Sequence, residues 1–176
     1  MAIAKWAEKT LNIAGPAGQI NARLGQSRFD LESGGKRSRS GFIMCHPHPL
    51  FAGTMDNKVV TTLVRAASRL PVAVNSRHDA EYLDTIRFNF RGVGESEGEF
   101  DHGKGEQNDL AAIITYAVEV LGWETLYLAG FSFGSGVACL YANNQTQQYA
   151  AKIAGLFLVA PAVHHFAAPA TLPFEF

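Results

Sequence analysis

The segment LYLAGFSFGSGVACL, residues 126–140, constrains the fold of this chain more than any other feature. It holds Gly130-Phe131-Ser132-Phe133-Gly134, a G-x-S-x-G pattern, between a hydrophobic run with strand character and a run with helical character. A sharp strand-to-helix turn needs small residues two positions before and two after the serine, because the backbone is crowded there. The pattern predicts a nucleophile elbow that projects the Ser132 hydroxyl above a sheet edge. The alternative interpretation is a glycine-rich connection that merely packs closely.

Runs of strand and helix character alternate from Gly41 onward, which predicts an α/β fold with a mostly parallel sheet covered by helices. Ahead of them, two short runs around Gly15-Pro16-Ala17-Gly18 predict a hairpin, residues 10–14 and 19–24. The later strands are expected at 41–45, 85–90, 125–129 and 153–160. The helices are expected from about 59 to 70, from Asn108 or Asp109 to Gly122, and from about 134 to 149.

Composition indicates one globular domain, since 47% of the 176 residues are hydrophobic and 18% are charged. The net charge of -1 supplies no basic field, which argues against nucleic-acid and membrane partners. The longest strongly apolar stretch, residues 153–163, is shorter than the roughly 18 residues of a membrane span. The N-terminus lacks the pattern of a signal peptide, so a cytoplasmic location is expected. Cys45 and Cys139 are expected to be buried free thiols.

Two other patterns indicate neither a cofactor nor a metal. The glycine-rich run at 91–100 lacks the third glycine of a dinucleotide loop, because Glu97 stands there, and its acidic residues would repel a pyrophosphate. His46-x-His48 is not completed to a ligand set by the scattered His78, Asp79 and His102. No cofactor and no metal are therefore expected.

Three long motifs occur in one order: HPHPLFAGTMDNKVV, then RFNFRGVGESEGEFDHGKGEQNDL, then LAGFSFGSGVA. Together they resemble the α/β-hydrolase superfamily, and closely its small bacterial predicted hydrolases related to dienelactone hydrolases. The resemblance covers most of residues 10–165 and implies an α/β-hydrolase fold with three αβα layers. It also implies a serine hydrolase that acts on a small carboxylic ester or related acyl substrate, through an acyl-enzyme on Ser132.

The elbow and the loop after the strand at 41–45 are expected to supply the oxyanion hole. The Phe133 N–H, at the start of the helix, is one expected donor. Pro47 and Pro49 have no N–H, so His48 or Leu50 must supply the second. His46 and His48, together with the two prolines, are expected to shape this loop.

The chain departs from the family in two places. Residues 71–84 add polar residues between helix and strand, which predicts a surface insertion. Family members carry a catalytic Asp and then a catalytic His after the serine, whereas only 16 residues follow Ala160 here. We therefore expect a single domain over residues 1–176 that is truncated after the strand at 153–160. His164 and His165, the only late histidines, are the candidates for the general base.

Two further expectations follow from these missing residues. The alternative to an active hydrolase is a catalytically inactive or truncated hydrolase-like shell that binds a small ligand or a partner. A last strand without its usual neighbour also exposes a sheet edge, which predicts homo-oligomers or aggregates.

Overall fold

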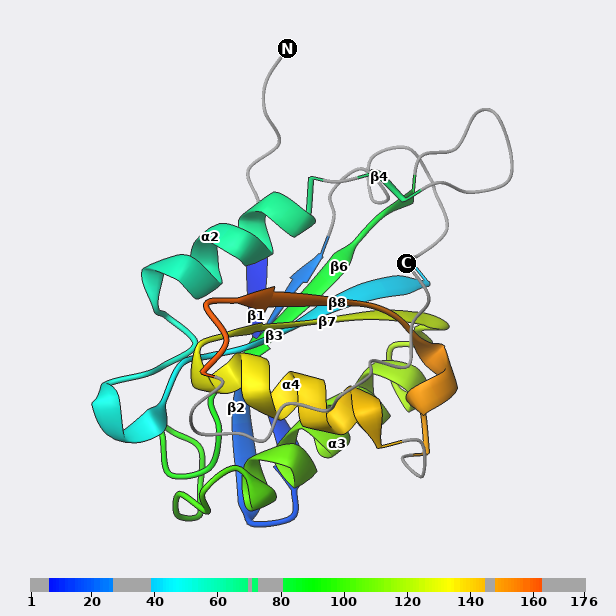
Figure 1. The fold of residues 1–176 in the computed structure, drawn as a ribbon. Helices are drawn as coiled ribbons and strands as arrows, with labels where there is room; N and C mark the ends of the chain where they lie inside the picture. The colour runs from blue at the N-terminus through cyan, green and yellow to red at the C-terminus, as the bar shows by residue number, and fades with distance from the viewer. Residues whose placement is uncertain (1–6, 27–38, 70, 73–80, 145–147, 163–176) are drawn as a thin grey trace.

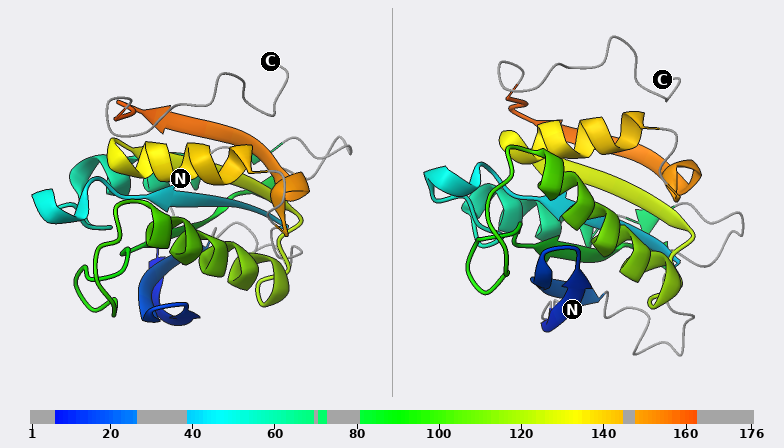
Figure 2. Two further views of the ribbon diagram at one scale, coloured as in Figure 1. Left: turned by 60° about the horizontal axis from the view of Figure 1, so that its bottom comes forward. Right: turned by 90° about the horizontal axis from the view of Figure 1, so that it is seen from below.

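The computed structural model describes residues 7–26, 39–69, 71–72, 81–144 and 148–162. They form one six-stranded sheet, in the order β1-β2-β6-β3-β7-β8, and a separate two-stranded sheet. Helix α2 covers one face of the large sheet, and α3 and α4 cover the other (Figures 1 and 2). This is the three-layer αβα architecture that the sequence predicts, with a mixed and mostly parallel sheet.

The N-terminal hairpin is present and is longer than the sequence predicts. Its strands are β1 (Ala7–Gly15) and β2 (Gly18–Gln26), and Gly15 lies opposite Gly18 across a two-residue turn. Strand β2 pairs antiparallel with β6 (Asp84–Phe88). The three remaining strands, β3 (Ser40–Cys45), β7 (Thr125–Phe131) and β8 (Ile153–Val159), complete the parallel part with β6. Parallel strands end at one edge of a sheet, so the loops after β3, β6 and β7 meet there.

Within the described residues three α-helices cover this sheet, and the structure corrects the predicted start of one and the predicted end of another. Helix α2 (Lys58–Ala67) is capped by the Asn57 side chain, which accepts the Val59 N–H at 2.9 Å. Helix α4 (Phe133–Asn143) ends six residues before the predicted end at 149, and Asn144 is already extended. Asparagine competes with helical hydrogen bonding through its side chain, which the apolar pattern does not register. A 3-10 turn, η2 (Ala150–Lys152), then leads into β8.

Helix α3 (Lys104–Glu119) starts a full turn before the predicted Asn108 or Asp109. The buried Glu106 carboxylate accepts the N–H groups of Asp101 at 2.9 Å and Gly103 at 2.7 Å. These two bonds satisfy backbone donors at the start of the helix, so the helix begins earlier. Asp109 lies inside the helix instead, where it is buried and pairs with Arg91 at 2.8 Å.

The predicted insertion at 71–84 is described only in part. Pro71–Val72 (β4) and Glu81–Tyr82 (β5) form a short antiparallel pair, and Asp84 is already the first residue of β6. Residues 73–80, with His78 and Asp79, lie outside the described part of the chain. A surface insertion therefore stays a prediction for residues 73–80.

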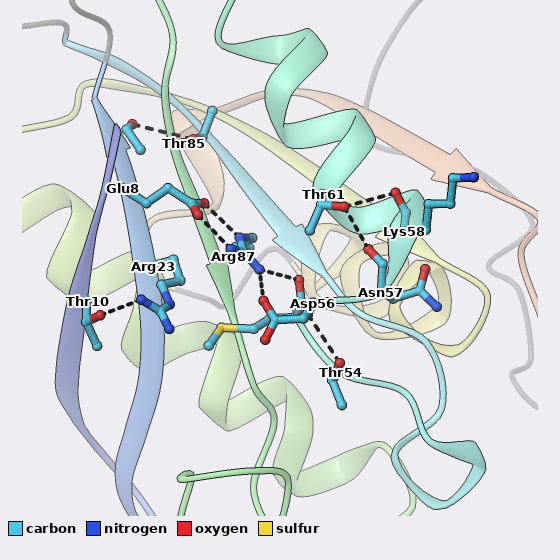
Figure 3. Close-up of polar contacts among 12 residues, drawn as sticks. Glu8, Thr10, Arg23, Thr54, Asp56, Asn57, Lys58, Thr61, Thr85 and Arg87 are labelled. Atoms are coloured by element: carbon cyan, nitrogen blue, oxygen red, sulfur yellow. Dashed lines mark hydrogen bonds and ion pairs between the residues drawn. The ribbon is translucent and has the colours of Figure 1, made fainter. Parts of the chain in front are cut away.

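An ion-pair network ties the hairpin to the connection before α2 (Figure 3). The buried Arg87 side chain on β6 donates two hydrogen bonds to the Glu8 carboxylate, at 2.7 and 2.6 Å. It also donates to the Met55 carbonyl oxygen at 2.8 Å and contacts the Asp56 carboxylate. The far end of the loop after β3 is thereby anchored to the sheet.

The burial of both cysteines agrees with the expectation from the sequence. Cys45 and Cys139 are both buried and free, and burial raises the pKa of each thiol. Among the described helices, none combines the length and the apolar character that crossing a membrane requires. A cytoplasmic location stays a prediction.

Candidate active site

The strand-to-helix turn around Ser132 is strained in the way that the G-x-S-x-G motif demands. Ser132 lies between β7 and α4 with φ 54° and ψ -115°, an unfavourable conformation for a residue with a side chain. A β-carbon on Gly130 would overlap the Gly134 carbonyl oxygen. A β-carbon on Gly134 would lie 2.5 Å from the carbonyl oxygens of Cys45 and His46. The close approach on both sides explains why these two positions need glycine.

The turn is held in place by the end of β8. The Ser132 N–H donates to the Val159 carbonyl oxygen at 2.9 Å. The Ser135 hydroxyl lies 2.6 Å from the Gly130 carbonyl oxygen and 3.1 Å from that of Val159. Ser135 is fully buried, whereas Ser132 is only half-buried and remains accessible. Sequence reasoning missed this role for Ser135; the available signal was a hydroxyl directly after the second glycine of the motif.

The loop after β3 folds back on itself beside the turn. Its 3-10 turn, η1 (Pro49–Phe51), is closed by the His48 carbonyl oxygen, which accepts the N–H groups of Phe51 and Gly53, both at 3.1 Å. The His48 Nδ1 atom accepts the Leu50 N–H at 3.2 Å. Asn89, just after β6, accepts the Met55 N–H at 2.8 Å and holds the end of the loop. The loop therefore has little freedom to rearrange.

His46 is built into this loop as a neutral, fully buried ring. Its Nε2 atom accepts the Phe90 N–H at 3.0 Å, and its Nδ1 atom lies 2.6 Å from the Pro47 carbonyl oxygen. Because Nε2 accepts a hydrogen bond, the ring proton must lie on Nδ1, and the Nδ1–H group donates to the Pro47 carbonyl oxygen. Burial lowers the pKa of His46 to about 4. Both nitrogens are thus engaged within the protein, so the ring serves to shape the loop and is unsuited to be a base or a metal ligand.

Aromatic rings connect the loop to Phe133, the residue after Ser132. The centroid of the His48 ring lies 4.9 Å from each of the rings of Phe51, Phe100 and Phe133. Phe100 comes from the connection between β6 and α3, and its ring lies 5.7 Å from that of Phe133. Sequence reasoning missed Phe51 and Phe100, because neither belongs to the G-x-S-x-G pattern and their proximity depends on two separate loops.

The predicted site residues that the structure describes lie at one edge of the sheet, where the loops after β3, β6 and β7 gather (Figure 1). Ser132 and Phe133 come from the last of these connections, and His48 and Leu50 from the first. His164 and His165 lie outside the described residues. The arrangement offers a strained, accessible hydroxyl at the N-terminus of α4, where the helix dipole favours negative charge.

Comparison with known proteins gives similarities over most of the chain. A family model described as alpha/beta hydrolase fold matches residues 70–174. The structure is similar to an alpha-beta serine hydrolase homologue from Coxiella burnetii, with 36% sequence identity and a TM-score of 0.71. It is also similar to XC6422 from Xanthomonas campestris, described as a member of a/b serine hydrolase without lid, with 34% identity and a TM-score of 0.67. An uncharacterized protein of Rickettsia prowazekii is 35% identical over 97 residues.

These similarities span most of this chain but only part of the other proteins. The two structural comparisons cover 95% and 92% of this chain, against 69% of the Coxiella chain and 63% of the Xanthomonas chain. The Rickettsia comparison covers 54% of this chain and 36% of that protein.

Proposed function

Because this chain belongs to the alpha/beta hydrolase family, we propose that it is a serine hydrolase with Ser132 as its nucleophile. The substrate class is a small carboxylic ester or a related acyl compound. The observation that carries the proposal is the backbone of Ser132, whose φ of 54° is retained although a serine adopts it only at a cost. Strain of this kind persists where the surrounding structure enforces it, and it is typical of functional sites.

In the proposed reaction, the Ser132 hydroxyl oxygen attacks the carbonyl carbon of the ester while its proton passes to a base. The carbonyl π bond breaks, and its oxygen becomes an oxyanion. Collapse of this intermediate expels the alcohol, which takes up the proton, and leaves an acyl-enzyme on Ser132. A water molecule then attacks the acyl carbon, the Ser132 oxygen leaves and takes up a proton, and the carboxylic acid is released.

The proposed oxyanion hole combines the Phe133 N–H with one donor from the loop after β3. Phe133 is the first residue of α4, so its amide lies at the positive end of the helix dipole. The second donor is His48 or Leu50. The Leu50 N–H is bonded to His48 Nδ1, so a contribution from Leu50 requires that bond to open.

The proposed general base is His164 or His165. The Ala162 N–H donates to the Ser132 carbonyl oxygen at 3.4 Å, so the chain that leaves β8 starts beside the nucleophile. His164 follows Ala162 by two residues, and two residues of extended backbone reach at most about 7 Å. An unassisted serine hydroxyl is a weak nucleophile at neutral pH, so the proposal requires such a base.

The experiment that tests this function is intact-mass spectrometry after treatment of the folded chain with a fluorophosphonate. The Ser132 oxygen forms a bond to phosphorus, and fluoride leaves. We expect one adduct per wild-type chain and no adduct on Ser132→Ala. Of the variants His164→Gln and His165→Gln, the one that lacks the base should be labelled more slowly than the wild type. Circular dichroism verifies that each variant is folded. A folded wild-type chain that forms no adduct would contradict the proposal and favour a non-catalytic shell.

A further inference from the structure

Two large hydrophobic side chains are exposed in the loop after β3, at the edge of the sheet that also carries the proposed nucleophile. Leu50 and Phe51, neighbours in the η1 turn, are 67% and 81% exposed. Exposure of large apolar side chains in pairs is unusual, whereas single ones are common on protein surfaces. The η1 turn projects from the same edge of the sheet that carries the start of α4 (Figure 1).

The turn is rigid enough to keep these side chains exposed. Two backbone hydrogen bonds to the His48 carbonyl oxygen close it, and the His48 side chain caps it through the Leu50 N–H. Ala52 follows in a left-handed conformation, with φ 56°. A β-carbon on Gly53 would overlap the Pro47 carbonyl oxygen, which shows how tightly the loop closes. A pre-organised apolar surface binds a ligand without the entropy cost of ordering it.

His48, Leu50, Phe51 and Phe100 form a surface that we call the apolar shelf. The His48 ring contacts Phe51 on one side and Phe133 on another, both with centroids 4.9 Å apart. Phe133 directly follows Ser132 in the chain. The shelf therefore contacts, through the His48 ring, the residue that follows the proposed nucleophile, and Phe51 is the most exposed of its side chains.

We propose that the apolar shelf binds the apolar group of the ester, so that the substrate class is esters with an alkyl chain of several carbons or an aromatic group. This inference rests on the proposed function of Ser132. None of the four shelf side chains is acidic or a permanent cation, so they supply no counter-charge for an anionic substrate. An apolar group placed on Phe51 and Leu50 would bury hydrophobic surface that water otherwise covers, which favours binding.

The test compares the rates at which two p-nitrophenyl phosphonates, one methyl and one hexyl, label Ser132. In each reaction the Ser132 oxygen bonds to phosphorus and p-nitrophenolate leaves, and its absorbance reports the rate. The wild-type chain should react faster with the hexyl probe. In Phe51→Ser and Leu50→Ser, the hexyl-to-methyl rate ratio should fall by about three- to tenfold, as expected for a lost apolar contact.

Val120→Ser is the matched control, because Val120 is 60% exposed at the opposite end of α3 from the site and should leave the ratio unchanged. Equal ratios in the wild type and both shelf variants would overturn the shelf while leaving Ser132 as the nucleophile. A folded wild-type chain that reacts with neither phosphonate nor fluorophosphonate would instead overturn the proposed function, and the shelf's role as an ester-binding surface with it. The two failures are therefore distinguishable.

Discussion

The α-carbon of Gly134 packs so closely against the backbone of His46 that a β-carbon at position 134 would lie 2.5 Å from the His46 carbonyl oxygen. The first turn of α4 and the loop after β3 are thereby fixed against each other. These are the two segments from which the proposed oxyanion donors come. An oxyanion hole works only when its donors are held in place before the reaction, so this contact bears directly on the site.

Gly134→Ala should therefore disturb both stability and the site. The three atoms nearest to the added methyl group would be backbone atoms of Cys45 and His46, so the loop must shift. We expect a loss of about 1–3 kcal/mol in the free energy of unfolding, typical of overpacking, and slower labelling of Ser132 by fluorophosphonate. Urea unfolding and labelling rates measure the two effects. Gly155→Ala is the control, because its nearest contact is the Tyr127 ring, which can move; equal effects of the two variants would contradict the prediction.

Ser132 offers a test of backbone strain that does not depend on activity. With φ 54° and ψ -115°, this position should favour glycine, which adopts such angles at little cost. We expect Ser132→Gly to be more stable than Ser132→Ala by about 1 kcal/mol. At ordinary positions the order reverses, because alanine restricts the unfolded chain more than glycine does. Thermal or urea unfolding measures the stability of the two variants, and an alanine variant more stable than the glycine variant would argue against strain at this position.

The buried ring of His46 should make stability depend on pH. Burial lowers its pKa to about 4, against 6.5 for an ordinary histidine. Between these values the unfolded chain binds a proton that the folded chain does not, so stability is greatest above about pH 6.5 and falls toward pH 4. The contribution of His46 to this loss should be on the order of 3 kcal/mol.

Urea unfolding between pH 4.5 and 7.5 tests this pH dependence. His46→Gln keeps an acceptor for the Phe90 N–H but cannot titrate, so its stability should change less over the range. Identical pH profiles for the wild type and the variant would show that another group is responsible.

Strand β8 gives the expected self-association a structural basis. Among the described residues it is the last strand in the sheet order, and Phe157 on it is 50% exposed beside Phe42 and Tyr127. No charged residue lies within β8, and an uncharged edge strand readily pairs with another copy. We propose that copies associate through this edge. Light scattering after size exclusion should show species larger than the monomer, and Ala154→Lys, at an exposed position, should reduce them; a wild-type chain that is monomeric would contradict this.

Local signals in the sequence were sufficient for most of the fold. Gly15 and Gly18 mark the hairpin turn, and apolar periodicity locates α2, β7 and β8 to within a few residues. The errors lie at helix ends: Glu106 starts α3 early by accepting two N–H groups, and α4 ends early at Asn143, after which Asn144 has an extended backbone. Such capping contacts depend on the path of the chain before and after the helix, which a hydrophobic pattern does not contain.

The sequence by itself determined the strained turn at Ser132, because the requirement for glycine around this residue is local and covers only five residues. The tertiary structure alone decided what surrounds it. The buried His46 ring accepts the Phe90 N–H, which comes from the end of another strand. The Ser135 hydroxyl lies within hydrogen-bond distance of the Val159 carbonyl oxygen because β8 pairs with β7. The apolar shelf likewise exists only where the loops carrying Phe51 and Phe100 meet. Contacts between residues far apart in the chain depend on sheet order and loop closure, and no local pattern encodes either.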